Sequence, residues 1–163
     1  MLHCCQVLAP AIYVDSQKAK TCALGHDLFR ATSPKSLLAL AQGYGLPILP
    51  AERDLPMLLH GPLAARFLRD QGEQSEEVLE AIAWHTTGRA GMSTLEKVLF
   101  ISDKVEPHKA DTIPALQRAW ALASQDLDQA LLQVLEWQIE SVKARGQPLH
   151  PATLEARDAL RRS

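Results

Sequence analysis

Histidines and aspartates recur along this chain at positions from which they could bind metal ions. His26 and Asp27 are adjacent in the stretch CALGHDLFR, and His60, His85 and Asp103 follow at long intervals. Each residue alone has an ordinary alternative, such as a turn residue or a cation at a helix end. Together they supply three imidazoles and two carboxylates, which is a ligand set for divalent Fe, Mn or Zn.

Asp103 is the most informative of these residues because it lies in the apolar stretch VLFISDK. Burying an unpaired carboxylate costs several kcal/mol or more, so Asp103 needs a partner. Leu99 and Phe100, the neighbours three and four residues back on a helix, offer none. A metal ion would provide one, while the alternatives are exposure to solvent or an ion pair with Lys104 or Lys97.

The adjacency of His26 and Asp27 restricts how they could bind metal. Neighbouring side chains point about 100° apart on a helix, so the two cannot chelate one ion from one face. The histidine could bind one ion while the carboxylate bridges to a second. Two ions ~3.5–4 Å apart would hold a bridging hydroxide and clamp the oxygens of a phosphoryl transfer.

The elements that carry these residues are predicted to be helices. Their signals are capping residues, prolines at first helical positions and apolar residues at helical spacing. We expect helices starting after Asp15, Ser33, Gly61, Ser75, Ser93, Ile113 and Asp126, and a last one over 152–161. Ser93 and Glu96 form a capping box, and residues 43–56 read as a loop. No segment alternates with period two, so the predicted fold is all-α, with one domain over residues 1–163.

Composition narrows the classes of function. The chain has 163 residues, of which 47% are hydrophobic, and a net charge of −2. This charge provides no basic surface for nucleic acid, and no apolar run reaches the ~20 residues that span a bilayer. The three cysteines have no metal-site spacing and no signal peptide is evident, which predicts buried reduced thiols in a cytoplasmic protein. A homodimer is plausible through an exposed part of the helix over 127–142.

The order of these residues resembles that of a known enzyme family. The ligand-type residues follow the H…HD…D pattern of the HD-domain metal-dependent phosphohydrolases, with the additional histidines of the two-metal variant, at His3, His26, Asp27, His60, His85 and Asp103. The segments LLHGPLAARFL, HTTGRAGMSTLEKVLFISDKVEP and GQPLHPATLEAR resemble those of the YqeK family. The similarity runs from about Val14 to Arg157. It implies a helical bundle that cleaves diadenosine tetraphosphate symmetrically to two ADP with iron or a similar metal.

The resemblance also implies a role for each matched ligand. His26, Asp103 and His3 would bind the first metal, and His60 and His85 would bind the second. Asp27 would bridge the two ions as a catalytic residue. The spacing from His3 to His26 departs from the family, because a helix shorter by about six residues loses ~9 Å and turns its remainder by about 240°. Pro10 also interrupts this segment, so His3 either misses the metal, leaving its place to water or a partner chain, or lies in a rebuilt segment.

Substrate-binding roles follow in the same way. The hydroxyls, backbone N–H groups and guanidinium of the loop Thr86, Thr87, Gly88 and Arg89 suit phosphate oxygens, and Arg89 would stabilise charge on the scissile group. The ordinary alternative for Arg89 is a solvated loop cation. Arg30 matches a basic family position and would also contact phosphate during catalysis. Glu106 and Lys109 fall on further substrate-side positions, and Lys109 replaces the usual arginine.

Two other functions remain open from the sequence. One is a phosphohydrolase that acts on a mononucleotide. The other is a degenerate HD module that binds nucleotide or a protein partner without catalysis, which the altered segment around His3 would explain.

Overall fold

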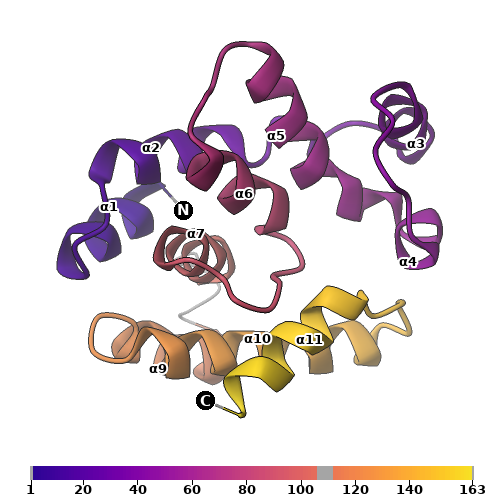
Figure 1. The fold of residues 1–163 in the computed structure, drawn as a ribbon. Helices are drawn as coiled ribbons and strands as arrows, with labels where there is room; N and C mark the ends of the chain where they lie inside the picture. The colour runs from indigo at the N-terminus through magenta and orange to yellow at the C-terminus, as the bar shows by residue number, and fades with distance from the viewer. Residues whose placement is uncertain (1, 106–111, 163) are drawn as a thin grey trace.

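The computed structural model describes residues 2–105 and 112–162, and the regular elements in these ranges are all helical (Figure 1). They are α1 Leu2–Ala11, α2 Ser16–Gly25, α3 Pro34–Gly43, α4 Pro50–Asp54, the 3₁₀ turn η1 Pro56–Leu59, α5 His60–Asp70, α6 Glu76–Trp84, α7 Thr94–Lys104, α9 Pro114–Leu122, α10 Leu127–Ala144 and α11 Pro151–Leu160. None of these helices is long and apolar enough to cross a membrane. The predicted all-α class is confirmed.

Helix α7 is the centre of the bundle. Its residues from Leu95 to Ser102 are buried except Lys97, as expected for a helix that is apolar on nearly all sides. Helices α1, α2 and α6 pack on one side of it and α9 and α10 on the other, with α11 covering α10 (Figure 1). Asp103, at the end of α7, is therefore placed between two layers of helices.

The predicted helix starts are confirmed where a capping residue marks them. The side chains of Asp15, Ser33 and Ser75 accept backbone N–H groups of α2, α3 and α6. Ser93 and Glu96 form the predicted capping box at the start of α7. These caps satisfy N–H groups that have no partner within the helix, which explains why the local sequence determines the boundaries.

Two boundaries were predicted wrongly. The expected loop over residues 43–56 contains α4, where the Glu52 carboxylate accepts the Leu49 N–H at 2.7 Å. Helix α5 begins at His60 rather than at Pro62. The physical reason is that no N–H of a first turn has a partner within the helix, so proline is tolerated at its third residue as well as its first.

Candidate metal centre and active site

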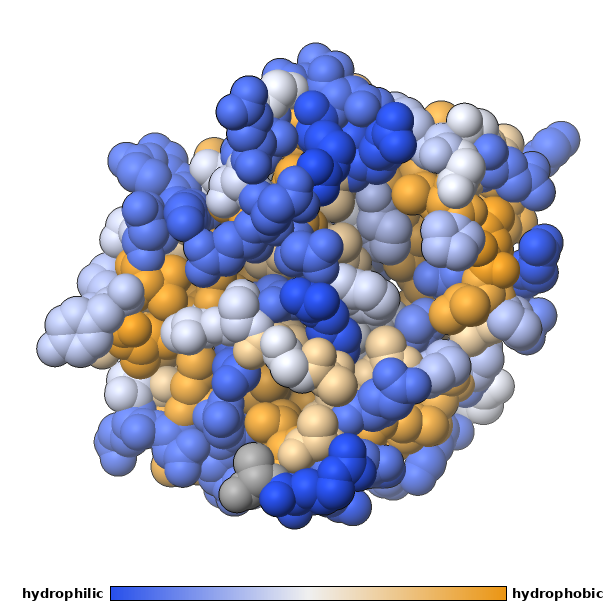
Figure 2. Space-filling view, viewed as in Figure 1, coloured by the Kyte–Doolittle hydropathy of each residue, from blue (hydrophilic) through white to orange (hydrophobic). Residues whose placement is uncertain are grey.

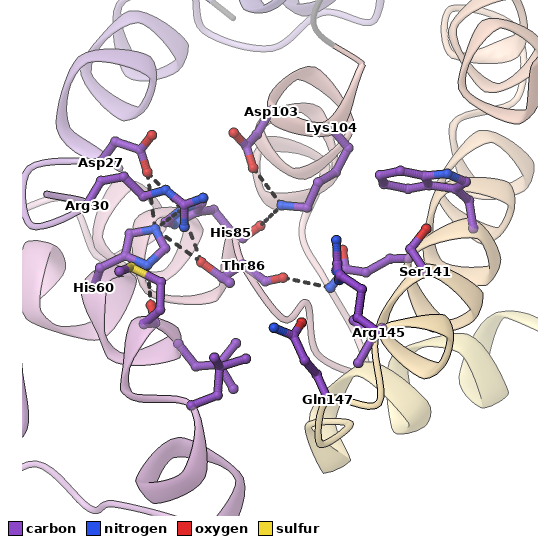
Figure 3. A pocket seen from close by; sticks show the side chains of 16 residues that line it. Asp27, Arg30, His60, His85, Thr86, Asp103, Lys104, Ser141, Arg145 and Gln147 are labelled. Carbon is purple, nitrogen blue, oxygen red and sulfur yellow. Dashed lines mark hydrogen bonds and ion pairs between the residues drawn. The ribbon is translucent and has the colours of Figure 1, made fainter. Parts of the chain in front are cut away.

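Three histidines from separate elements converge on Asp27. His26, His60 and His85 cap the C-terminal ends of α2, η1 and α6, respectively. Oδ2 of Asp27 is 3.4 Å from Nε2 of His26, whereas Oδ1 is 3.1 Å from Nε2 of His60 and 3.7 Å from Nε2 of His85. The two carboxylate oxygens thus face different histidines, which supports the predicted bridging role of Asp27 (Figure 3).

Backbone carbonyls orient all three imidazole rings in the same way. Nδ1 of His26, His60 and His85 lies 3.1, 2.5 and 2.7 Å from the carbonyl oxygen three residues earlier. A carbonyl oxygen only accepts, so each Nδ1 carries a proton and each Nε2 is the nitrogen turned toward Asp27, where it can donate a proton to the carboxylate or, once deprotonated, bind metal. Histidine ligands of metals are held by second hydrogen bonds of this kind.

The spacing of two of these nitrogens is compatible with a shared metal ion. Nε2 of His60 and Nε2 of His85 are 2.9 Å apart, so they form a hydrogen bond when one carries a proton and can bind one ion when neither does. Two imidazole nitrogens bound at right angles to one metal at ~2.1 Å would lie ~3.0 Å apart. Ligand atoms of His26, Asp27 and His85 also lie within 4.8 Å of one another. The donor set therefore fits divalent metal.

Asp103 meets the cluster from α7. Its Oδ1 is 3.7 Å from Nε2 of His26, and its Oδ2 accepts a 2.6 Å bond from Nζ of Lys104. Of the two lysines considered from the sequence, Lys104 is the partner, while Lys97 pairs with Asp128 instead. The carboxylate is thus both ion-paired and aimed at the histidine side of the site.

The charges of the cluster shift its pKa values. Burial lowers the pKa of His26, but hydrogen bonds to Asp103 and Asp27 outweigh it and raise the value to about 9. Burial lowers the pKa of His85 to about 4. Hydrogen bonds from His26, His60 and His85 hold the pKa of Asp27 far below its usual range. Burial opposes ionisation of Asp103, but Lys104 and His26 keep its pKa well below the usual value. The centre therefore keeps its carboxylates ionised, as metal ligands must be.

His3 is not brought to this cluster. It lies on the exposed side of α1, whereas Cys4 and Cys5 occupy the buried side, and Sγ of Cys4 donates to the carbonyl of Val105. The ligand role of His3 stays a prediction, and the arrangement of the described residues does not support it.

The predicted phosphate loop divides into an inner and an outer part. Oγ1 of Thr86 is 3.2 Å from Nε2 of His85 and lines the cleft beside the metal ligands. Thr87 is buried, and its carbonyl accepts a 2.7 Å bond from Thr153. Gly88 adopts a positive φ of 67° and packs against Phe100. Thr87 and Gly88 shape the loop, and only Thr86 of these three lines the cleft.

Arg89 points to a different surface. Its Nε and Nη2 donate to the two carboxylate oxygens of Glu96 at 2.7 and 3.2 Å, and Nη2 is 3.3 Å from Glu80. The Glu96 side chain is only 1% exposed and also accepts the N–H of Ser93. Arg89 is thus neither a free loop cation nor a lining residue of the cleft. Its catalytic role stays a prediction, and the geometry favours a structural one.

The candidate metal ligands lie at a cleft of about 570 Å³. The space-filling view shows a hollow between α4 and α11, on the side of the molecule where this cleft opens (Figure 2). Arg30 lines this cleft, and its predicted contact with phosphate stays a prediction. The other side chains that line it and were missed from the sequence include Lys104, Trp137, Gln138, Ser141 and Arg145. Glu106 and Lys109 lie outside the described residues.

Comparison with known proteins identifies the family of the chain. The HD domain family matches residues 1–108. Over 90% of its length the chain is 33% identical to a symmetrical bis(5'-nucleosyl)-tetraphosphatase of Bacillus subtilis, of which it covers 77%. The enzyme of the same name from Halalkalibacterium halodurans is 32% identical, over 94% of this chain and 81% of the relative.

The fold has a counterpart among crystal structures. An HD superfamily hydrolase from Clostridium acetobutylicum, described as involved in NAD metabolism, superposes with a TM-score of 0.91 at 30% identity, covering 99% of this chain and 85% of that one. The chain therefore belongs to the HD domain family and, within it, to the group of the symmetrical bis(5'-nucleosyl)-tetraphosphatases. The family expected from the sequence is confirmed, and it makes this protein a metal-dependent phosphohydrolase.

Proposed function

We propose that this enzyme cleaves dinucleoside tetraphosphates symmetrically, with diadenosine tetraphosphate as substrate and two ADP as products. The observation that carries the proposal is the convergence of three Nε2 atoms on Asp27 at one wall of a cleft that also holds Arg30 and Lys104. The names of the two relatives at 32–33% identity support the substrate.

The proposed centre holds two ions, with iron preferred and manganese or zinc as alternatives, because imidazole and carboxylate ligands suit all three. His26 and Asp103 would hold one ion, His60 and His85 the other, and Asp27 would face both. When bound, divalent metal lowers the pKa of coordinated water and polarises phosphoryl oxygens.

The chain's own side chains would bind the phosphates around this centre. The Thr86 hydroxyl lies beside the histidine nitrogens, and Arg30 and Lys104 supply positive charge for phosphate oxygens. We place the enzyme in the cytoplasm, and a homodimer is part of the proposal.

The test is a product assay on protein reconstituted anaerobically with Fe²⁺ or Mn²⁺. Diadenosine tetraphosphate should yield ADP alone, in a reaction that EDTA stops. AMP with ATP as products, or the same rate without metal, would contradict the proposal. Inorganic phosphate released from a mononucleotide would favour the mononucleotide alternative, and bound but intact nucleotide would favour the non-catalytic module. NAD belongs in the same assay because of the description of the C. acetobutylicum protein.

Two histidine variants test the ligand set by a second measurement. His85→Gln should lose bound metal, because it removes a nitrogen that faces Asp27. His3→Gln should retain the metal content of the wild type, because His3 lies on the exposed side of α1. Equal metal loss in both variants would restore His3 as a ligand.

A further inference from the structure

One face of α10 forms the cleft wall that lies across from the metal ligands. Trp137, Ser141 and Arg145 are four residues apart, so they lie on one side of the helix, and all three line the cleft. Figure 3 shows Ser141 and Arg145 projecting from this wall, with Thr86 between them and His60. The two walls are tied together at Thr86, whose carbonyl accepts a 2.9 Å bond from Nε2 of Gln138.

The charge on this wall has no ion-pair partner among residues 2–105 and 112–162. Arg145 is exposed and forms no ion pair among the residues that the structure describes. Its neighbour Lys143, on the same turn, is paired with Glu140 at 3.3 Å. Arg145 is therefore a cation that faces the cleft and is available for an anion there.

The carboxylates of the metal centre do not pair with Arg145. Among the described residues, the carboxylates that line the cleft are Asp27 and Asp103, and both are engaged by histidines, with Lys104 also held by Asp103. A ligand that satisfies Arg145 must carry negative charge beyond the phosphate at the metal centre. A polyphosphate chain has this property, and a monophosphate does not.

The aromatic residue on the same face suits the other end of a nucleotide. Trp137 is half-buried and packs against the core, so its indole is held in a defined position while it lines the cleft. Nucleic-acid bases stack on such rings, and a hydroxyl such as that of Ser141 can bond to a sugar or phosphate.

We propose that this face of α10, formed by Trp137, Ser141 and Arg145, binds the nucleoside diphosphate half of the substrate that lies away from the metal centre. Arg145 binds its phosphates and Trp137 stacks on its base. The inference rests on the proposed function only for the identity of the ligand, since symmetrical cleavage makes this half a nucleoside diphosphate.

The test is binding of ADP to the metal-loaded protein, followed by tryptophan fluorescence. ADP should quench the wild type, and Trp137→Phe should lose most of the quenching although Trp84 and Trp120 remain. Arg145→Ala should weaken ADP binding roughly 10- to 100-fold, because it removes charge-assisted bonds to phosphate. Arg145→Lys should recover part of the affinity. Lys143→Ala is the matched control on the same turn and should bind ADP as the wild type does.

Turnover separates this inference from the proposed function. With diadenosine tetraphosphate, Arg145→Ala should raise KM, whereas Lys143→Ala should not. If Arg145→Ala and Lys143→Ala both keep the wild-type KM and the wild-type ADP affinity, the inference is wrong while the function stands. If the wild type fails to hydrolyse the substrate but ADP binding still requires Arg145 and Trp137, the function is wrong while the binding surface stands. Quenching that persists in Trp137→Phe would overturn the assignment of the base.

Discussion

Arg89 provides a direct test of whether the HTTGR loop acts on substrate or on stability. The sequence predicts that its guanidinium binds the scissile phosphate, but in the structure both of its bonding nitrogens contact the buried carboxylate of Glu96. Arg89→Ala would leave that carboxylate with the Ser93 N–H as its remaining strong partner. We therefore expect loss of stability rather than loss of chemistry.

The size of the effect follows from the burial of the pair. Removing one partner of a buried ion pair costs about 3–5 kcal/mol. The Arg89 side chain is 36% exposed, so water screens it and the lower end of this range applies, about 3 kcal/mol. For a chain of this length, that loss lowers Tm by about 6–12 °C. Arg89→Lys keeps the charge but not the two-pronged contact, and should lose less.

The assay combines urea unfolding with kinetics well below Tm. Arg161→Ala is the control, because Arg161 makes an exposed contact of similar form with Glu136 and should cost no more than about 1 kcal/mol. A double variant that also carries Glu96→Gln should recover part of the loss, because it removes the unpaired charge. If Arg89→Ala keeps the wild-type unfolding midpoint but loses roughly 100-fold or more in kcat, Arg89 acts on the phosphate and the structural assignment is wrong.

Two further predictions concern buried positions. A Cβ at Gly61 would lie 2.9 Å from the carbonyl oxygen of Ile82 and 3.1 Å from Nδ1 of His85, so Gly61→Ala should lower both Tm and metal content. Gly43→Ala is the control, because a Cβ there has nothing within 4 Å, and it should lower neither quantity. An unchanged metal content in Gly61→Ala would refute the close packing. Burial raises the pKa of the Cys22 thiol to about 12, so iodoacetamide at pH 8 should label it only after denaturant is added, as peptide mass spectrometry can show. Rapid labelling of the native protein would contradict that burial.

The fold was predictable because its helix boundaries carry local signals. Asp15, Ser33, Ser75 and Ser93 each satisfy N–H groups within a few residues of themselves, so a short window of sequence suffices. The errors at α4 and α5 arose where prolines mark a first turn without fixing which of its residues they occupy. The packing of helices around α7 depends on contacts between residues far apart in the chain, so residue spacing did not predict it and only the family resemblance indicated a bundle.

Apart from His3, the residues that come together at the candidate site were predictable, and the walls of the cleft were not. His26, His60 and His85 are rare residue types whose chemistry restricts their roles, so their convergence could be anticipated. The contact of Arg89 with Glu96 could not, because the capping box already accounted for that glutamate. Arg145 gave no signal either, since a cation at a helix C-terminus is the ordinary partner of the helix dipole.

The positions of the three histidines show how the bundle favours a cation at this point. Each caps the C-terminal end of a helical element, where carbonyl groups lack partners within the helix. Each places its Nδ1–H on the carbonyl oxygen three residues earlier, and the same bond turns Nε2 toward Asp27. The C-terminal ends of α2 and α6 also direct their partial negative charges at the cluster, which favours positive charge there. One local arrangement, repeated three times, thus turns the three Nε2 atoms toward Asp27, and at His26 and His85 it does so at helix ends whose negative potential favours a divalent metal.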